Sequence, residues 1–86
     1  MDIEKNIKEN FKKTETQELS ADIDEMREYL HRGKWTSEQT TYMFNVHNKY
    51  TGIIERAKFC PPCRQKVQRR CVLINDLYKK EYEQKR

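Results

Sequence analysis

Three segments of this chain carry apolar residues at the spacing of an α-helix, and the first covers about residues 21–32. In it, Ile23, Met26 and Leu30 fall on one side of the helix. Ser20 precedes the segment as a suitable N-cap, and acidic residues in the first turn favour the positive end of the helix dipole. The pattern predicts a first helix that ends before Gly33.

The second segment begins with a capping box, Thr36-Ser37-Glu38-Gln39. The hydroxyl of Thr36 can accept a hydrogen bond from the backbone of Gln39, whose side chain can reach back to Thr36. Thr51-Gly52 ends the pattern, which predicts a second helix over about residues 37–50. Its apolar and aromatic side is formed by Tyr42, Met43, Val46 and Tyr50.

The third and longest segment predicts a helix over about residues 62–84. Cys60 and Pro61 each precede a proline and are disfavoured in the α conformation, so we expect this helix to begin no earlier than Pro62. One side of the helix carries the apolar stripe Cys63, Val67, Cys71, Ile74 and Tyr78, widened by Leu77 and Tyr82.

The remaining residues show weaker patterns. Only Ile3, Ile7 and Phe11 interrupt a polar run after Met1, and we expect residues 1–18 to form a flexible polar tail. The stretch 53–59 is too short to classify, and we treat it as a loop. The predicted fold is therefore all-α, a small three-helix domain over residues 19–86 with a loose N-terminal tail.

The composition points to a thin hydrophobic core. Apolar residues make up 35% and charged residues 37% of the 86 residues, close to the range in which a chain buries too little apolar surface to offset the entropy of ordering. We therefore expect a protein partner, a metal or self-association to add stability. No apolar run approaches the roughly 20 residues that span a bilayer, and no secretion signal is recognisable. We expect an intracellular protein without a membrane association.

The positive charge is concentrated in the last third of the chain. Residues 1–54 hold 8 Lys/Arg and 10 Asp/Glu, whereas residues 55–86 hold 10 Lys/Arg and 4 Asp/Glu. A basic flank on a helix can follow the phosphates of a nucleic acid, bind a protein partner, or form an ordinary solvated surface. The candidate partner- or phosphate-binding residues are Arg64, Lys66, Arg69, Arg70, Lys79 and Lys80.

The CPPC sequence, Cys60 to Cys63, has several interpretations. A structural zinc site needs four ligands, and this motif supplies two. His47 is a further candidate, but Cys71 lies eight residues after Cys63 on one helix, about 12 Å away, and is expected in the core. A second chain could supply the missing thiolates. In that form the motif resembles the zinc hook of coiled-coil DNA-repair ATPases, where a CPxC turn from each of two chains shares one zinc.

Two other interpretations of this motif remain. Cys63 lies near a helix N-terminus beside Arg64 and Lys66, an environment that lowers the pKa of a thiol and suits redox chemistry. A thioredoxin-like enzyme needs a βαβ scaffold, however, which the sequence does not predict. In the simplest interpretation, the cysteines are reduced, the two prolines fix the start of a helix, and no cofactor is bound.

The stretch from Trp35 to Gly52, followed by CPPC and a basic helix, resembles short, mostly uncharacterised proteins of tailed bacteriophages. The matching residues are Asn48, Thr51, Gly52, Cys60 and Cys63. The resemblance implies a phage context, and with it a host-directed or replication-associated accessory factor or a minor virion component, located in the host cytoplasm or the virion.

Signatures of common enzymes are absent from the sequence, which has no GxGxxG, GxxxxGK[ST], HExxH or GxSxG motif. We therefore predict a non-catalytic helical protein-interaction module. The alternatives are a nucleic-acid-binding accessory protein that uses the basic flank, and a dimer stapled by zinc through CPPC.

Overall fold

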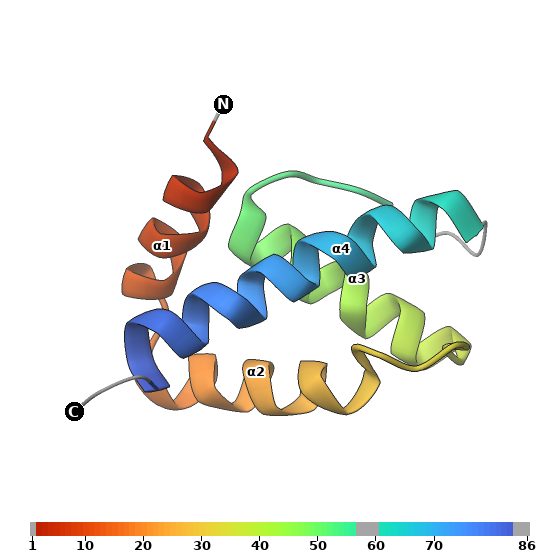
Figure 1. The fold of residues 1–86 in the computed structure, drawn as a ribbon, viewed down its shortest axis with the longest axis horizontal. Coiled ribbons are helices and arrows are strands. Elements are labelled where there is room, and N and C mark those ends of the chain that lie inside the picture. Colours follow the sequence, from red (N-terminus) through yellow and green to blue (C-terminus); the bar gives the residue numbers. More distant parts are fainter. Residues whose placement is uncertain (1, 57–60, 84–86) are drawn as a thin grey trace.

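The computed structural model describes residues 2–56 and 61–83, which form four α-helices and a final π-helical turn. The elements are α1 (Ile3–Lys13), α2 (Thr16–Tyr29), α3 (Ser37–Thr51), α4 (Pro61–Tyr78) and the π-helical turn η1 (Lys79–Glu83). In Figure 1, α4 crosses in front of α3. Helix α1 lies near the C-terminal end of α4, drawn in blue, and α2 lies below α4 in this view. The predicted all-α class is confirmed, but the described part of the chain has four helices where three were predicted.

Helix α1 replaces most of the predicted flexible tail, so that prediction is wrong for Ile3–Lys13. Asp2 caps the helix by accepting a hydrogen bond from the backbone of Lys5. Ile7 and Phe11 are buried in the common core, where the Phe11 ring meets those of three tyrosines edge to face. The ring centroid of Phe11 lies 5.5 Å from that of Tyr50 in α3. It lies 6.1 Å from that of Tyr78 in α4 and 6.0 Å from that of Tyr82 in η1.

Helix α2 begins at Thr16, five residues earlier than predicted. No side chain caps this end, so Ser20, the predicted N-cap, lies inside the helix. The earlier start brings Leu19 into the core beside Ile23 and Met26. The start at residue 21 is thus wrong, because tertiary burial of Leu19 supports a turn that the cap signal did not indicate.

Helix α3 follows its sequence signals closely. Thr36 and Gln39 form both hydrogen bonds of the capping box, at 3.1 and 3.0 Å. Gly52 adopts a left-handed conformation with φ of 75° and donates its backbone N–H to the carbonyl of Asn48. Only one residue separates the end of this helix from the prediction.

Helix α4 begins at Pro61, one residue before the predicted limit, and passes directly into η1. The predicted stripe is largely confirmed, because Val67, Cys71, Ile74 and Leu77 are buried. Cys71 is fully buried as a free thiol, and burial raises its pKa to about 12. No helix among the described residues is long and apolar enough to cross a bilayer.

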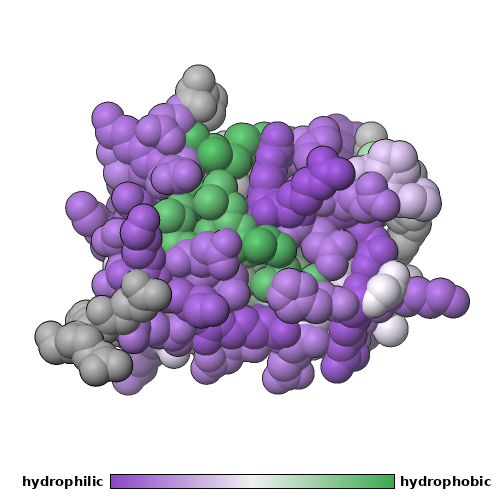
Figure 2. Space-filling model, viewed as in Figure 1, coloured by the Kyte–Doolittle hydropathy of each residue, from purple (hydrophilic) through white to green (hydrophobic). Residues whose placement is uncertain are grey.

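The face of the molecule seen in Figure 2 is mostly hydrophilic, with one apolar patch. Compared with the ribbon in the same view, this patch lies over the middle of α4 and extends toward α1. The Val, Leu and Ile side chains that remain accessible on α4, on α1 and after α3 are Val72, Leu73, Ile3, Ile53 and Ile54.

Candidate interaction surface on helix α4

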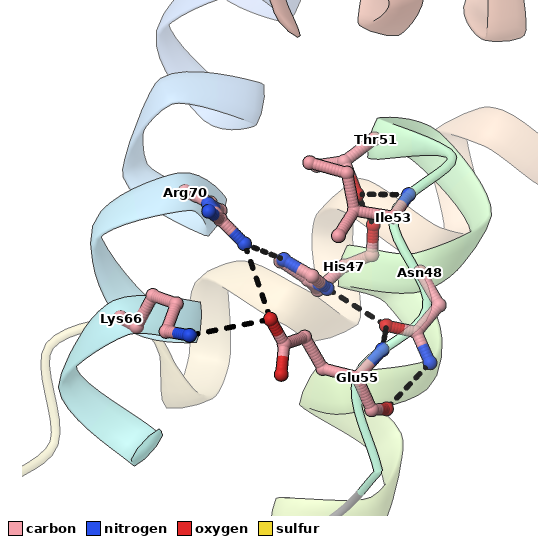
Figure 3. A network of polar contacts seen from close by, with 7 residues as sticks. All are labelled: His47, Asn48, Thr51, Ile53, Glu55, Lys66 and Arg70. Atoms are coloured by element: carbon pink, nitrogen blue, oxygen red, sulfur yellow. Dashed lines mark hydrogen bonds and ion pairs between the residues drawn. The ribbon is translucent and has the colours of Figure 1, made fainter. Parts of the chain in front are cut away.

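The side of α4 that faces the segment after α3 is held by a polar cluster, drawn in Figure 3. Its members come from α3, from the connection to α4 and from α4 itself. We call it the α3–α4 cluster, and it consists of His47, Asn48, Thr51, Glu55, Lys66 and Arg70.

His47 is the buried centre of the α3–α4 cluster, and its ring is 0% exposed. Its Nε2 lies 3.2 Å from the Arg70 guanidinium, and its Nδ1 lies 2.8 Å from Oδ1 of Asn48. Because a guanidinium can only donate, Nε2 must accept, which places the ring proton on Nδ1. Burial lowers the pKa of His47, so the arrangement holds this histidine neutral.

Glu55 connects the same cluster to two cations on α4. Its carboxylate lies 3.3 Å from Nζ of Lys66 and 3.6 Å from the guanidinium of Arg70. The hydrogen bond from Lys66 is the main reason why the pKa of Glu55 is lowered. Two of the six candidate phosphate-binding residues therefore already have an anionic partner within the chain.

The Asn48–Thr51–Gly52 pattern has a structural role in this fold. Asn48 donates from Nδ2 to the carbonyl of Glu55 at 2.9 Å and accepts from the backbone N–H of Glu55 at 3.1 Å. The hydroxyl of Thr51 donates to the carbonyl of His47 and accepts from the backbone of Ile53. Together with the left-handed Gly52, these bonds fix the backbone after α3 so that Glu55 faces α4.

Arg64, another candidate phosphate-binding residue, forms contacts within the chain at the opposite edge of α4. Its guanidinium stacks over the ring of Trp35 at 4.5 Å and donates to the carbonyl of Arg32 at 2.6 Å. Trp35 in turn donates from Nε1 to the carbonyl of Tyr29 at 2.8 Å. These contacts satisfy carbonyl groups at and just after the C-terminal end of α2. Arg64 therefore joins α4 to the connection between α2 and α3.

The other three candidate residues, Arg69, Lys79 and Lys80, are exposed. Among residues 2–56 and 61–83, none of their side chains forms an ion pair or a side-chain hydrogen bond. Arg69 also borders a shallow hollow on α4, which is lined by Gln65, Gln68, Arg69 and Val72. The predicted basic flank is thus divided into residues with internal contacts and residues that face solvent.

The apolar part of this surface was not predicted from the sequence. Val72 and Leu73 are half-buried, and Ile54 is 78% exposed. Their signal was present in the sequence, because Val72 and Leu73 lie outside the predicted stripe of α4 on a helical projection. Apolar residues away from a buried stripe can form a second contact surface, or they can be singly exposed without a role. The residues around them in the structure decide between these two interpretations.

The predicted metal ligands are not assembled within the described residues. Cys60 lies outside them, and both ring nitrogens of His47 already have hydrogen-bond partners. Cys63 is half-buried and disulfide-bonded, which differs from the reduced thiol that we expected. In the described ranges, three or more His, Cys, Asp or Glu side chains do not come together in a group that could hold a metal ion.

Comparison with protein families, with curated proteins and with solved structures finds no match for this chain.

Proposed function

We propose that this protein is a non-catalytic helical interaction module, and that the solvent-facing side of α4 binds a protein partner. The observation that carries the proposal is the apolar patch on an otherwise hydrophilic face (Figure 2). Contiguous apolar surface of this kind favours association with another protein, because its burial removes apolar area from water. On α4, the half-buried aliphatic side chains are those of Val72 and Leu73.

The internal contacts of the basic flank favour a protein over a nucleic acid as the partner. Binding to nucleic acid depends on the number of phosphates that basic side chains neutralise. Lys66 and Arg70 pair with Glu55, and Arg64 stacks on Trp35, so three of the six candidate residues already have contacts within the chain. Three cations remain, and the half-buried side chains of Val72 and Leu73 lie between them in the sequence.

Two potentially reactive side chains are buried in the fold, which favours a binding role over a catalytic one for them. The ring of His47 is buried, with both nitrogens engaged. The thiol of Cys71 is buried, and its pKa is raised to about 12, so it is protonated near neutral pH. Neither group meets a substrate in this arrangement.

We also propose a bacteriophage setting for the protein, because the sequence resembles short proteins of tailed bacteriophages. A small accessory or minor virion protein that acts by binding another protein needs one accessible surface and no active site. The proposal for α4 does not depend on that setting.

Site-specific photocrosslinking in the cells that produce the protein tests the proposed function. A photoreactive residue replaces Gln65 on the solvent-facing side of α4, and a matched variant carries it at Asn45, which is exposed on α3. We expect a discrete protein adduct from position 65 and none from position 45. Adducts that contain nucleic acid, or equal adducts from both positions, would overturn the proposal.

A further inference from the structure

The solvent-facing side of α4 has a definable strip, which we call the outer strip of α4. Its five α4 residues fall within about 100° of one another on a helical projection, and its sixth residue lies in η1, directly after α4. Four of them are exposed and two are half-buried. They are Gln65, Arg69, Asp76 and Lys80, which are exposed, and Val72 and Leu73, which are half-buried.

The outer strip places a cation on each side of an apolar centre. Arg69 precedes Val72 and Leu73, and Lys80 follows them, with Lys79 beside it. Lys80, in η1, lies eleven positions after Arg69, a separation of about 16 Å at the rise of an α-helix. Neither cation has an ion-pair partner among the described residues.

We infer that the outer strip binds an acidic amphipathic helix of a partner protein. This inference rests on the proposed function and specifies the chemistry of the partner. The apolar side of such a helix covers Val72 and Leu73, and its carboxylates, about 16 Å apart, pair with Arg69 and Lys80. The hollow that Arg69 and Val72 border, together with Gln65, receives an apolar side chain of the partner.

The position of Asp76 favours an acidic helix over a nucleic acid as the partner of the outer strip. It is exposed on the outer strip, between the two cations. A nucleic-acid strand carries a charge about every 3.4 Å along its axis, so phosphates would lie against Asp76 and against the apolar centre. A peptide with carboxylates only near its two ends avoids this repulsion and leaves no charge over Val72 and Leu73.

Charge complementarity at the ends of the strip sets the expected orientation and specificity. Pairs at the rim of an interface contribute mainly to association rate and selectivity, whereas the apolar centre supplies most of the affinity. Reversal of both cations therefore weakens binding to an acidic helix and favours a basic one.

A designed peptide tests this inference with the full-length protein. The probe is a stapled amphipathic helix of about 15 residues, with leucines on one side and glutamates about 16 Å apart at its ends. A second peptide has lysines in place of those glutamates, and an oligothymidylate of similar length serves as the polyanion. Fluorescence anisotropy measures the affinity of each probe.

We expect the acidic peptide to bind more tightly than either other probe, and Arg69→Glu with Lys80→Glu to weaken it by about tenfold. The same double variant should bind the basic peptide more tightly than the unmodified protein does. Lys12→Glu with Lys13→Glu, on exposed positions of α1, is the matched control and should change nothing. Circular dichroism verifies that all variants are folded.

Oligothymidylate binding that exceeds peptide binding, or acidic-peptide binding that ignores the reversal, would overturn the inference. A protein adduct from position 65 together with no binding of the acidic peptide would refute this partner chemistry while leaving the proposed function intact. An adduct with nucleic acid from the same position would refute both.

Discussion

Arg69 and Arg70 are neighbours in the sequence, yet they belong to two different sides of α4. Arg70 faces the α3–α4 cluster, where its guanidinium contacts His47 and Glu55. Arg69 faces solvent and has no such contact within the described chain. A rotation of 100° about the helix axis therefore separates a residue that holds the fold from one that is available to a partner. A count of basic residues along the sequence treats the two as equal.

The largest expected effect on stability concerns α1, where a buried and an exposed residue are again neighbours in the sequence. Phe11 is buried, and Lys12 is exposed. Phe11→Ala removes a ring packed against three tyrosine rings and leaves a cavity, which should lower the free energy of unfolding by about 3–5 kcal/mol. Lys12→Ala should change it by less than about 0.5 kcal/mol. Chemical denaturation measures both, and equal effects would show that α1 does not belong to the core.

Arg70→Glu should have the next largest effect on stability. The change leaves the buried Nε2 of His47 without a donor and places a carboxylate beside Glu55. We expect a loss of about 2–3 kcal/mol. Arg69→Glu is the matched substitution and should cost less than about 0.5 kcal/mol. Urea unfolding followed by circular dichroism compares the two variants, and similar losses would abolish the distinction between the two sides of α4.

The parts of the fold that could be predicted from the sequence are those that local signals determine. The capping box at Thr36 and the left-handed position at Gly52 lie within a few residues of the groups they contact, so the bounds of α3 were accurate. Helix α1 was missed because Ile7 and Phe11 become a helical stripe only when a surface to bury them exists. Phe11 meets rings from α3, α4 and η1, and periodicity within the first residues does not reveal these partners.

The candidate surface could likewise be predicted only in part from the sequence. The basic flank was recognised from composition, but its division depends on contacts distant in the sequence. Glu55 lies 11 residues before Lys66, and Arg64 bonds to a carbonyl 32 residues away. Such pairings arise from tertiary packing, which a single sequence without relatives does not reveal.

Cys71 and Val72 provide a third pair of neighbours on the two sides of α4. Cys71 is fully buried, whereas Val72 is half-buried. Cys71→Ser replaces a buried thiol, whose Sγ lies 3.9 Å from the carbonyl of Met43, with a more polar hydroxyl and should destabilise the protein by about 1–2 kcal/mol. Val72→Thr makes a similar change on the outer strip and should cost less, about 0.5 kcal/mol or below. Thermal unfolding of both variants measures the difference, and a larger loss for Val72→Thr would place that residue in the core.

The two histidines extend the comparison to pH, because His47 is buried in the α3–α4 cluster while His31 is exposed. The groups that face His47 are Asn48, Glu55, Lys66 and Arg70, and burial is the main cause of its lowered pKa. The folded protein thus binds a proton at His47 less readily than the unfolded chain, whose histidine has a pKa near 6.5. The contribution of neutral His47 to stability is complete above that value and is lost as the pH falls through the lower folded pKa, with a slope of at most about 1.4 kcal/mol per pH unit. Glu55 and Glu83 also have lowered pKa values, and the stability they contribute is lost at more acidic pH, below about 4.5.

Urea unfolding between pH 8 and pH 5, roughly the range in which histidine titrates, should therefore show a decline in the free energy of unfolding. His47→Gln should remove this decline, and His31→Gln should leave it unchanged. A decline that persists in the His47→Gln variant would assign the proton to another group and show that the α3–α4 cluster does not depend on a neutral histidine.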